Sequence, residues 1–182
     1  MQKSKGFVSA VVMVLTLAMV ACASTRTQKS AGEQVDDTVT TASVKSALIA
    51  DPVTKAHQID VEVFKGTVQL NGFVDTAASK ERAAQVAKST KGVTAVRNNL
   101  TVKTTERSGE TAVDDSAITA KVKSALAGDP RTKAHQINIE TRAGAVQLSG
   151  FVDSSEAKAT AEELARAVDH VKSVDNELDV KK

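Results

Sequence analysis

The sequence predicts an α+β protein made of two tandem copies of one small domain, each folded in the order α-β-β-α-β. Residues 36–103 align without a gap on residues 114–181, and about half of the aligned positions are identical. Within each copy, two stretches place apolar residues at helical spacing and three place them at alternating positions. We therefore expect a small three-stranded mixed sheet with two helices in each copy.

The first helix of each copy is predicted by an apolar face that stops at an Asp-Pro pair, at 51–52 and at 129–130. Proline disfavours helical geometry in the residue before it, so the helices should end there. In the second copy we expect Asp115 or Ser116 to cap the first turn through its side-chain oxygen. The apolar face of that copy consists of Ile118, Val122, Ala125 and Leu126.

A β-hairpin is expected after each first helix. Apolar residues alternate with polar ones over 59–63, and a second alternating run covers 68–74. Gly66, and Gly144 in the second copy, supply the positive φ that a tight hairpin turn requires.

The remaining elements of each copy are a second helix and a closing strand. Helical spacing of apolar residues predicts the helices at about 76–90 and 154–169. Alternating apolar residues predict the closing strands near 96–102 and 174–180.

The first 21 residues have the pattern of a secretory signal peptide. Lys3 and Lys5 precede an almost unbroken apolar run over 7–20, and small residues follow it. The run is short for a membrane-spanning helix, which needs ~20 apolar residues, although a weak transmembrane anchor is the alternative. These two lysines account for the whole excess of Lys and Arg, 24, over Asp and Glu, 22. The rest of the chain is neutral, which argues against nucleic-acid binding.

Cys22, the single cysteine, follows Met19-Val20-Ala21, and this segment resembles the lipobox of bacterial lipoproteins. The resemblance implies cleavage before Cys22, which would carry a diacylglyceryl thioether and an N-acyl chain. Ala23 resembles the outer-membrane sorting pattern, so we expect a lipid anchor at the periplasmic face of the outer membrane. An ordinary small residue after a secretory signal is the alternative. Residues 22–35 are expected to form the lipidated start and a flexible tether.

Each repeat resembles the BON domain. The similarity lies in a Val-x-Leu-x-Gly strand after a Gly turn, at 66–72 and 144–150, and in a closing Val-x-x-Val-x-Asn-x-Leu-x-Val segment. His170 departs from the pattern, because the family often has glycine at that position, as the first copy does at Gly92. The resemblance implies BON domains at 36–103 and 114–181, joined by a linker at 104–113.

Together with the lipobox, the two BON domains are similar to dual-BON outer-membrane lipoproteins. Osmotically inducible periplasmic proteins of the family lack the anchor. The family resemblance implies phospholipid binding and a role in envelope integrity or stress tolerance. It also implicates the first helix of the second BON domain in contacts with anionic phospholipid.

The densest basic cluster outside the signal peptide lies on and just after that helix. Each lysine near an anionic membrane contributes about 1 kcal/mol of attraction. The alternative is a solvated polar face, since acidic residues such as Asp114, Asp115 and Asp129 lie nearby. The expected lipid-binding residues are Lys121, Lys123, Arg131 and Lys133.

A competing interpretation is a protein–protein adaptor or chaperone-like protein of the envelope. Phe64 is expected to be exposed at the tip of the first hairpin, where it would contact lipid or a protein partner. Exposed sheet edges would serve an adaptor equally well. We expect no catalytic residues, no cofactor and no metal site: His57 and His135 stand singly before a strand, and no nucleophile, base and oxyanion site assembles.

Overall fold

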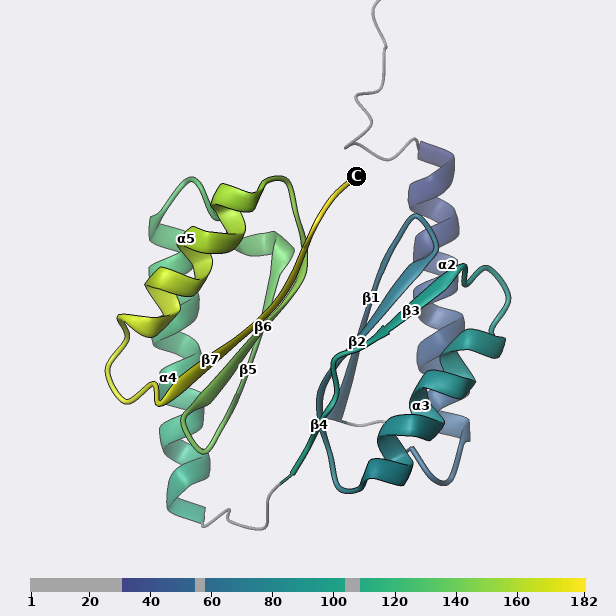
Figure 1. Ribbon diagram of the computed structural model, residues 1–182, viewed down its shortest axis with the longest axis horizontal. Helices are drawn as coiled ribbons and strands as arrows, with labels where there is room; N and C mark the ends of the chain where they lie inside the picture. Colours follow the sequence, from purple (N-terminus) through teal and green to yellow (C-terminus); the bar gives the residue numbers. More distant parts are fainter. Residues whose placement is uncertain (1–30, 55–57, 104–108) are drawn as a thin grey trace, which may run out of the picture.

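The computed structural model describes residues 31–54, 58–103 and 109–182. Figure 1 shows two similar units, each with two helices on one face of a small sheet, and the two sheets lie between the helix pairs. The elements follow the order α-β-β-α-β in both copies, with the middle strand of each sheet provided by the second hairpin strand. The predicted α+β fold of two tandem units is confirmed.

The first helices begin earlier than the sequence indicates. α2 (Ala31–Ala50) includes residues 31–35, which we expected in the flexible tether. α4 (Gly109–Gly128) likewise includes residues 109–113 of the expected linker. Both helices end directly before the Asp-Pro pair, as the sequence predicts.

Neither Asp115 nor Ser116 is the N-cap of α4, because the helix begins at Gly109 and both residues lie inside it. The Asp115 carboxylate serves the hairpin turn instead. Its Oδ2 and Oδ1 accept hydrogen bonds from the backbone N–H groups of Ala143 and Gly144, at 2.8 and 2.9 Å. Asp37 of α2 binds the two equivalent N–H groups of the first hairpin at the same two distances. Both carboxylates are buried, so the hydrogen bonds compensate for their loss of hydration. The first helix of each unit thereby fixes a turn that lies 28 residues after its aspartate.

The ends of these helices are closed by buried threonines. The Thr132 hydroxyl donates a hydrogen bond to the Leu126 carbonyl at 2.6 Å, and Thr54 does the same to Leu48. The carbonyls of a last helical turn lack partners within the helix, so these bonds satisfy groups that would otherwise be buried and unpaired. The threonine at the same position of both copies, Thr54 and Thr132, therefore has a structural role.

The hairpins pair in antiparallel fashion in both units. They consist of β1 (Ile59–Phe64) with β2 (Thr67–Val74), and β5 (Ile137–Arg142) with β6 (Ala145–Val152). All four turn residues have positive φ, between 49° and 83°, as a two-residue hairpin turn requires.

The second helices start where the sequence predicts. Thr76 caps α3 (Ala77–Ser89), and Ser154 caps α5 (Ser155–Arg166), each through its side-chain oxygen. α5 ends three residues before the expected Asp169.

The closing strand lies parallel to the middle strand of each sheet. β7 (Ser173–Val180) pairs with β6 along its whole length. In the first unit the strand is interrupted and appears as β3 (Ala95–Asn98) and β4 (Thr101–Val102), both parallel to β2. His170 adopts a φ of +70°, close to the +91° of Gly92, so the histidine takes the left-handed conformation that glycine takes in the first copy.

Each unit has its own hydrophobic core between its helices and its sheet. Burying one Leu or Val side chain fully contributes roughly 1.5–3 kcal/mol. The fully buried leucines that anchor the two cores are Leu48, Leu70, Leu100, Leu126, Leu148 and Leu178.

Candidate functional site

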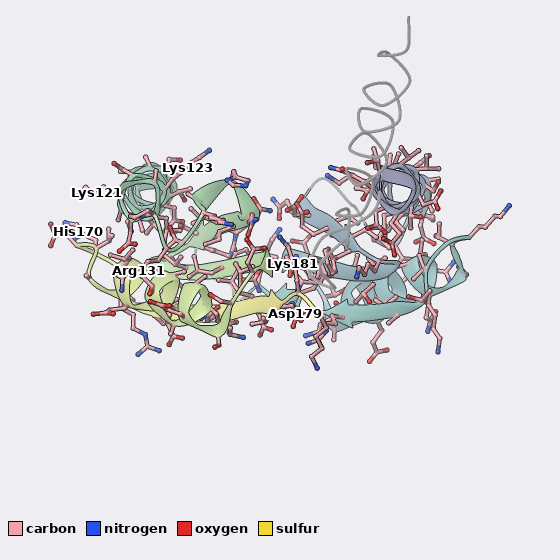
Figure 2. All side chains as sticks on the ribbon, turned by 90° about the horizontal axis from the view of Figure 1, so that it is seen from above. Lys121, Lys123, Arg131, His170, Asp179 and Lys181 are labelled. Carbon is pink, nitrogen blue, oxygen red and sulfur yellow. The ribbon has the colours of Figure 1, made fainter. Side chains whose placement is uncertain are left out.

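α4 presents two of the predicted lipid-binding residues on its outer surface. Val122 is fully buried, so with 3.6 residues per turn its neighbours Lys121 and Lys123 project to either side of the helix. Both are exposed, and Figure 2 shows them on the outer part of α4. No ion pair within the described part of the chain involves either lysine. The exposed stripe between them consists of Ala117, Ala120, Ser124 and Ala127.

Arg131 is held by an acidic neighbour. Its Nη2 lies 2.6 Å from Asp129 Oδ2, and its Nε donates to Asp129 Oδ1 at 3.0 Å. The side-chain and backbone hydrogen bonds from Arg131 lower the pKa of Asp129 to about 2. Figure 2 places Arg131 apart from the two lysines, on the side toward α5.

Lys133 is also paired. Its Nζ lies 2.7 Å from Asp153 Oδ2, while Lys181 Nζ lies 2.7 Å from Asp153 Oδ1. Hydrogen bonds from the two lysines hold the pKa of Asp153 well below its usual range. The ammonium group of Lys133, in the turn after α4, thus forms an ion pair with Asp153, which directly follows β6.

The structure therefore divides the four predicted residues. Lys121 and Lys123 share one helix and remain available to an external anion. Arg131 and Lys133 each face an aspartate, and exposed ion pairs of this kind cancel much of the local field while contributing little stability. A lipid headgroup would have to compete with Asp129 and Asp153 for these two side chains.

The histidines do not form a metal centre in the described residues. His135 lies in a short 3₁₀ helix (Ala134–Gln136), and His170 lies in the turn after α5; both are exposed. In the ranges that the structure covers, no three His, Cys, Asp or Glu side chains gather to hold a metal ion. His57 lies outside those ranges.

The predicted signal peptide and Cys22 also lie outside the described residues. Among the helices that the structure describes, none combines the length and the apolar character needed to cross a bilayer. The lipid anchor therefore stays a prediction.

Two buried glutamines join the units reciprocally. Gln69 of β2 accepts a hydrogen bond from the Gly150 N–H at 3.0 Å, and Gln147 of β6 accepts one from the Gly72 N–H at 2.7 Å. Gln147 Nε2 also donates to the Asn99 carbonyl at 2.8 Å. Because equivalent residues of the repeat exchange the same contacts, the two units pack like the subunits of a two-fold symmetric dimer.

Phe64 belongs to this interface and is not exposed. Its ring stacks on Phe151 of the second unit with centroids 5.2 Å apart, and only 8% of the residue is accessible. At the equivalent place, the Arg142 guanidinium lies over the Phe73 ring at 6.0 Å. The expectation of an exposed hairpin-tip phenylalanine was wrong, because the second unit covers it.

The interface also brings two carboxylates toward each other. Asp60 of β1 and Glu140 of β5 line one pocket of about 280 Å³ between the units. Partial burial, and then the Asp60 carboxylate, raise the pKa of Glu140. Asp60 Oδ1 lies 3.6 Å from Lys45 Nζ, which offsets part of the repulsion.

Comparison with known proteins assigns the repeat to a family. The BON domain matches residues 36–104 and 114–182, which is most of the chain. The protein belongs to the BON domain family. It is 40% identical to osmotically-inducible protein Y of Escherichia coli (strain K12) over 151 residues, which cover 82% of this chain and 75% of that protein.

Two further relatives of similar coverage match both BON domains. The 21 kDa hemolysin of Actinobacillus pleuropneumoniae is 35% identical over 148 residues, 80% of this chain and 75% of that protein. The outer membrane lipoprotein DolP of Haemophilus influenzae is 33% identical over 147 residues, again 80% and 75%.

The interface between the BON domains is the part of the molecule that sequence reasoning missed. A signal was present: Gln69 and Gln147 occupy the same position of the Val-Gln-Leu block, on the strand face opposite the core residues. Phe73 and Phe151 lie on that same face, where a solvated strand would carry polar side chains. A shared glutamine beside a shared phenylalanine on the outer face indicates that this face is covered.

Proposed function

We propose that this BON-domain protein is lipid-anchored at the periplasmic face of the outer membrane and binds anionic phospholipid through α4, in support of envelope integrity under osmotic or other stress. The similarity to an outer membrane lipoprotein and to an osmotically inducible protein supports the envelope role. The lipobox-like segment before Cys22 supports the anchor.

One observation carries the lipid-binding part of the proposal. Lys121 and Lys123 flank an outer stripe of small residues on α4, and both are exposed, whereas Arg131 and Lys133 are paired with Asp129 and Asp153. Small residues between the lysines let the helix approach a headgroup layer closely. Two lysines contribute about 2 kcal/mol of attraction to anionic lipid, or roughly 30-fold in affinity.

An attraction of this size gives only weak membrane binding for a free protein, but it is sufficient to keep an anchored protein in contact with the bilayer surface. Acyl chains on Cys22 would hold the domains next to the bilayer, so that a low-affinity surface contact occurs at high effective concentration. The adaptor interpretation loses Phe64 as a contact residue, since that ring is buried between the units.

The direct test is flotation with vesicles, using a chain that begins at Ala23. Every contact described above lies within residues 31–182, so this chain retains both domains and lacks the lipidated cysteine. At low salt we expect binding to vesicles that contain phosphatidylglycerol, weak binding to pure phosphatidylcholine, and loss of the difference as salt is raised.

The Lys121→Gln/Lys123→Gln variant should bind the anionic vesicles about 10- to 30-fold more weakly. The matched control is Lys88→Gln/Lys91→Gln, which removes two exposed lysines at the end of α3 in the other unit. Equal losses in the two variants would mean that binding responds to net charge alone and not to α4. Absence of any preference for anionic vesicles at low salt would refute the lipid proposal.

A further inference from the structure

The outer face of α2 carries the most prominent exposed apolar side chains of the described residues. Val35, Val39 and Ile49 are 63%, 60% and 73% accessible, and Val53 in the turn after the helix is 44% accessible. Single exposed apolar residues are normal in soluble proteins, but a contiguous set marks an interaction surface.

These residues lie along one line of the helix. Spacings of four, seven and fourteen residues from Val35 lead to Val39, Ala42 and Ile49, which share one face of a helix. That face is opposite to Val44 and Leu48, which are fully buried in the core. We refer to Val35, Val39 and Ile49 as the α2 stripe.

The second unit shows that the fold does not require the larger side chains at two of the three stripe positions, while the third, Val35, corresponds to Val113. The positions equivalent to Val39 and Ile49 are Ala117 and Ala127 on α4, and both are exposed. α4 packs on its sheet as α2 does, with Val122 and Leu126 fully buried. Because the same domain forms with alanine at these two positions, folding does not require the larger side chains of Val39 and Ile49.

Two features indicate what covers the stripe. Figures 1 and 2 show α2 and α4 on the same face of the molecule, so a plane that touches the outer side of α4 also approaches α2. In addition, Ala31 lies nine positions after Cys22, a span of at most ~30 Å when extended. A lipid anchor at Cys22 therefore keeps the start of α2 close to the bilayer.

We propose that the α2 stripe docks on the bilayer surface, at the boundary between headgroups and acyl chains, while α4 contacts the headgroups through its lysines. This inference rests on the proposed function, since it concerns the same membrane and the same face. Glu33 and Asp36 place negative charge beside the first turns of α2, where an anionic surface repels it, so the attraction of the α2 stripe to the membrane comes from apolar contact. A coiled coil with a second copy is disfavoured, because the α2 stripe spans only about two heptads and such seams need three or four.

The first test holds the protein at a membrane independently of its own affinity. A chain beginning at Ala23 contains no cysteine, so Ile49→Cys provides a unique site for a bimane label, and Lys88→Cys on α3 is the control. An N-terminal hexahistidine before Ala23 attaches either chain to phosphatidylcholine vesicles that contain nickel-chelating lipid and a nitroxide-labelled lipid. We expect quenching at position 49 to exceed that at position 88 by on the order of twofold.

Equal quenching at the two positions would overturn the α2 proposal, whatever the α4 lysines do. Stronger quenching at position 49 than at position 88 supports the α2 proposal. If Lys121→Gln/Lys123→Gln leaves lipid binding unchanged, that result refutes the α4 proposal alone.

A second test uses the residues of the other copy. Without the hexahistidine, Val39→Ala/Ile49→Ala should weaken binding to vesicles about tenfold at both low and high salt, because apolar contact area is lost. Lys121→Gln/Lys123→Gln should abolish the salt dependence instead. If sedimentation shows a wild-type dimer that Val39→Ala/Ile49→Ala dissociates, the stripe belongs to a second copy and the membrane proposal is wrong.

Discussion

At the scale of single residues, Glu140 is the clearest case in which the packing of the two domains acts on a charge. Its carboxyl group shares a pocket with Asp60 and Arg142 at the interface, and Lys45 Nζ lies 3.6 Å from Asp60 Oδ1. Partial burial and the Asp60 carboxylate raise the pKa of Glu140. The folded protein therefore binds this proton more tightly than the unfolded chain does.

The sign of the pH effect follows from that difference. Glu140 favours folding below the pKa of the unfolded chain, and this contribution is lost as the pH rises through the higher folded pKa. Replacing Glu140 with Gln should raise Tm at pH 7 by on the order of 1 °C, with a smaller effect at pH 4. Differential scanning calorimetry of the variant and of Glu163→Gln, an exposed change on α5, provides the comparison.

An equal effect of Glu140→Gln at both pH values would mean that ionisation of this group is not coupled to folding. A decrease in Tm at pH 7 would show that the carboxylate makes a favourable contact there.

At the scale of helices and strands, the sequence predicts which elements exist, and whether each is a helix or a strand, better than it predicts where each begins and ends. The ends of α2 and α4 were predictable because Asp-Pro is a local signal, and so were the starts of α3 and α5 near residues 76 and 154. The starts of α2 and α4 were not, because Asp37 and Asp115 bind a hairpin turn nearly 30 residues away rather than their own helix. A contact of that sequence separation has no signature in a local pattern.

The close approach of β6 to the segment before β5 gives a prediction at this scale. A Cβ added to Gly150 would lie 2.3 Å from the Gln136 carbonyl oxygen, and the residue has a φ of +121°. Gly150→Ala should therefore destabilise the second domain by about 2 kcal/mol or more in urea denaturation.

Gly128→Ala is the matched control, because nothing lies within 4 Å of a Cβ added at the end of α4. It should leave stability unchanged or raise it by about 0.5–1 kcal/mol. Comparable losses of stability in the two variants would show that the contact between Gly150 of β6 and the Gln136 carbonyl is less close than described.

At the scale of the whole molecule, the two BON domains pack against each other through reciprocal glutamine hydrogen bonds and the Phe64–Phe151 stack. Gln147→Ala would leave the Gly72 N–H and the Asn99 carbonyl in the interface without their partner, at a cost of about 1–3 kcal/mol. Amide hydrogen exchange should then accelerate at Gly72 and also at Gly150, since the reciprocal Gln69 contact depends on the same docking.

The control for this prediction is Gln85→Ala, an exposed change on α3. Unchanged exchange at Gly150 in the Gln147→Ala protein would mean that the two halves of the interface act independently.

The candidate site was predictable only in part at this scale. The sequence located Lys121 and Lys123 on the helix that carries the proposal, because they flank a core residue of clear helical period. It could not show that Asp153, 20 residues after Lys133, removes that lysine from the group. Nor could it show that the second domain buries Phe64, since one domain alone leaves the hairpin tip open.

The central claim is that one face, formed by α4 and α2, meets an anionic membrane. The most direct test is paramagnetic broadening of the amide signals of a chain beginning at Ala23, bound to bicelles of phosphatidylcholine and phosphatidylglycerol with a nitroxide-headgroup lipid. We predict the strongest broadening along residues 117–127 of α4 and the outer side of α2, with α3 and α5 little affected. Broadening centred on α3 or α5, or none at low salt, would contradict this account.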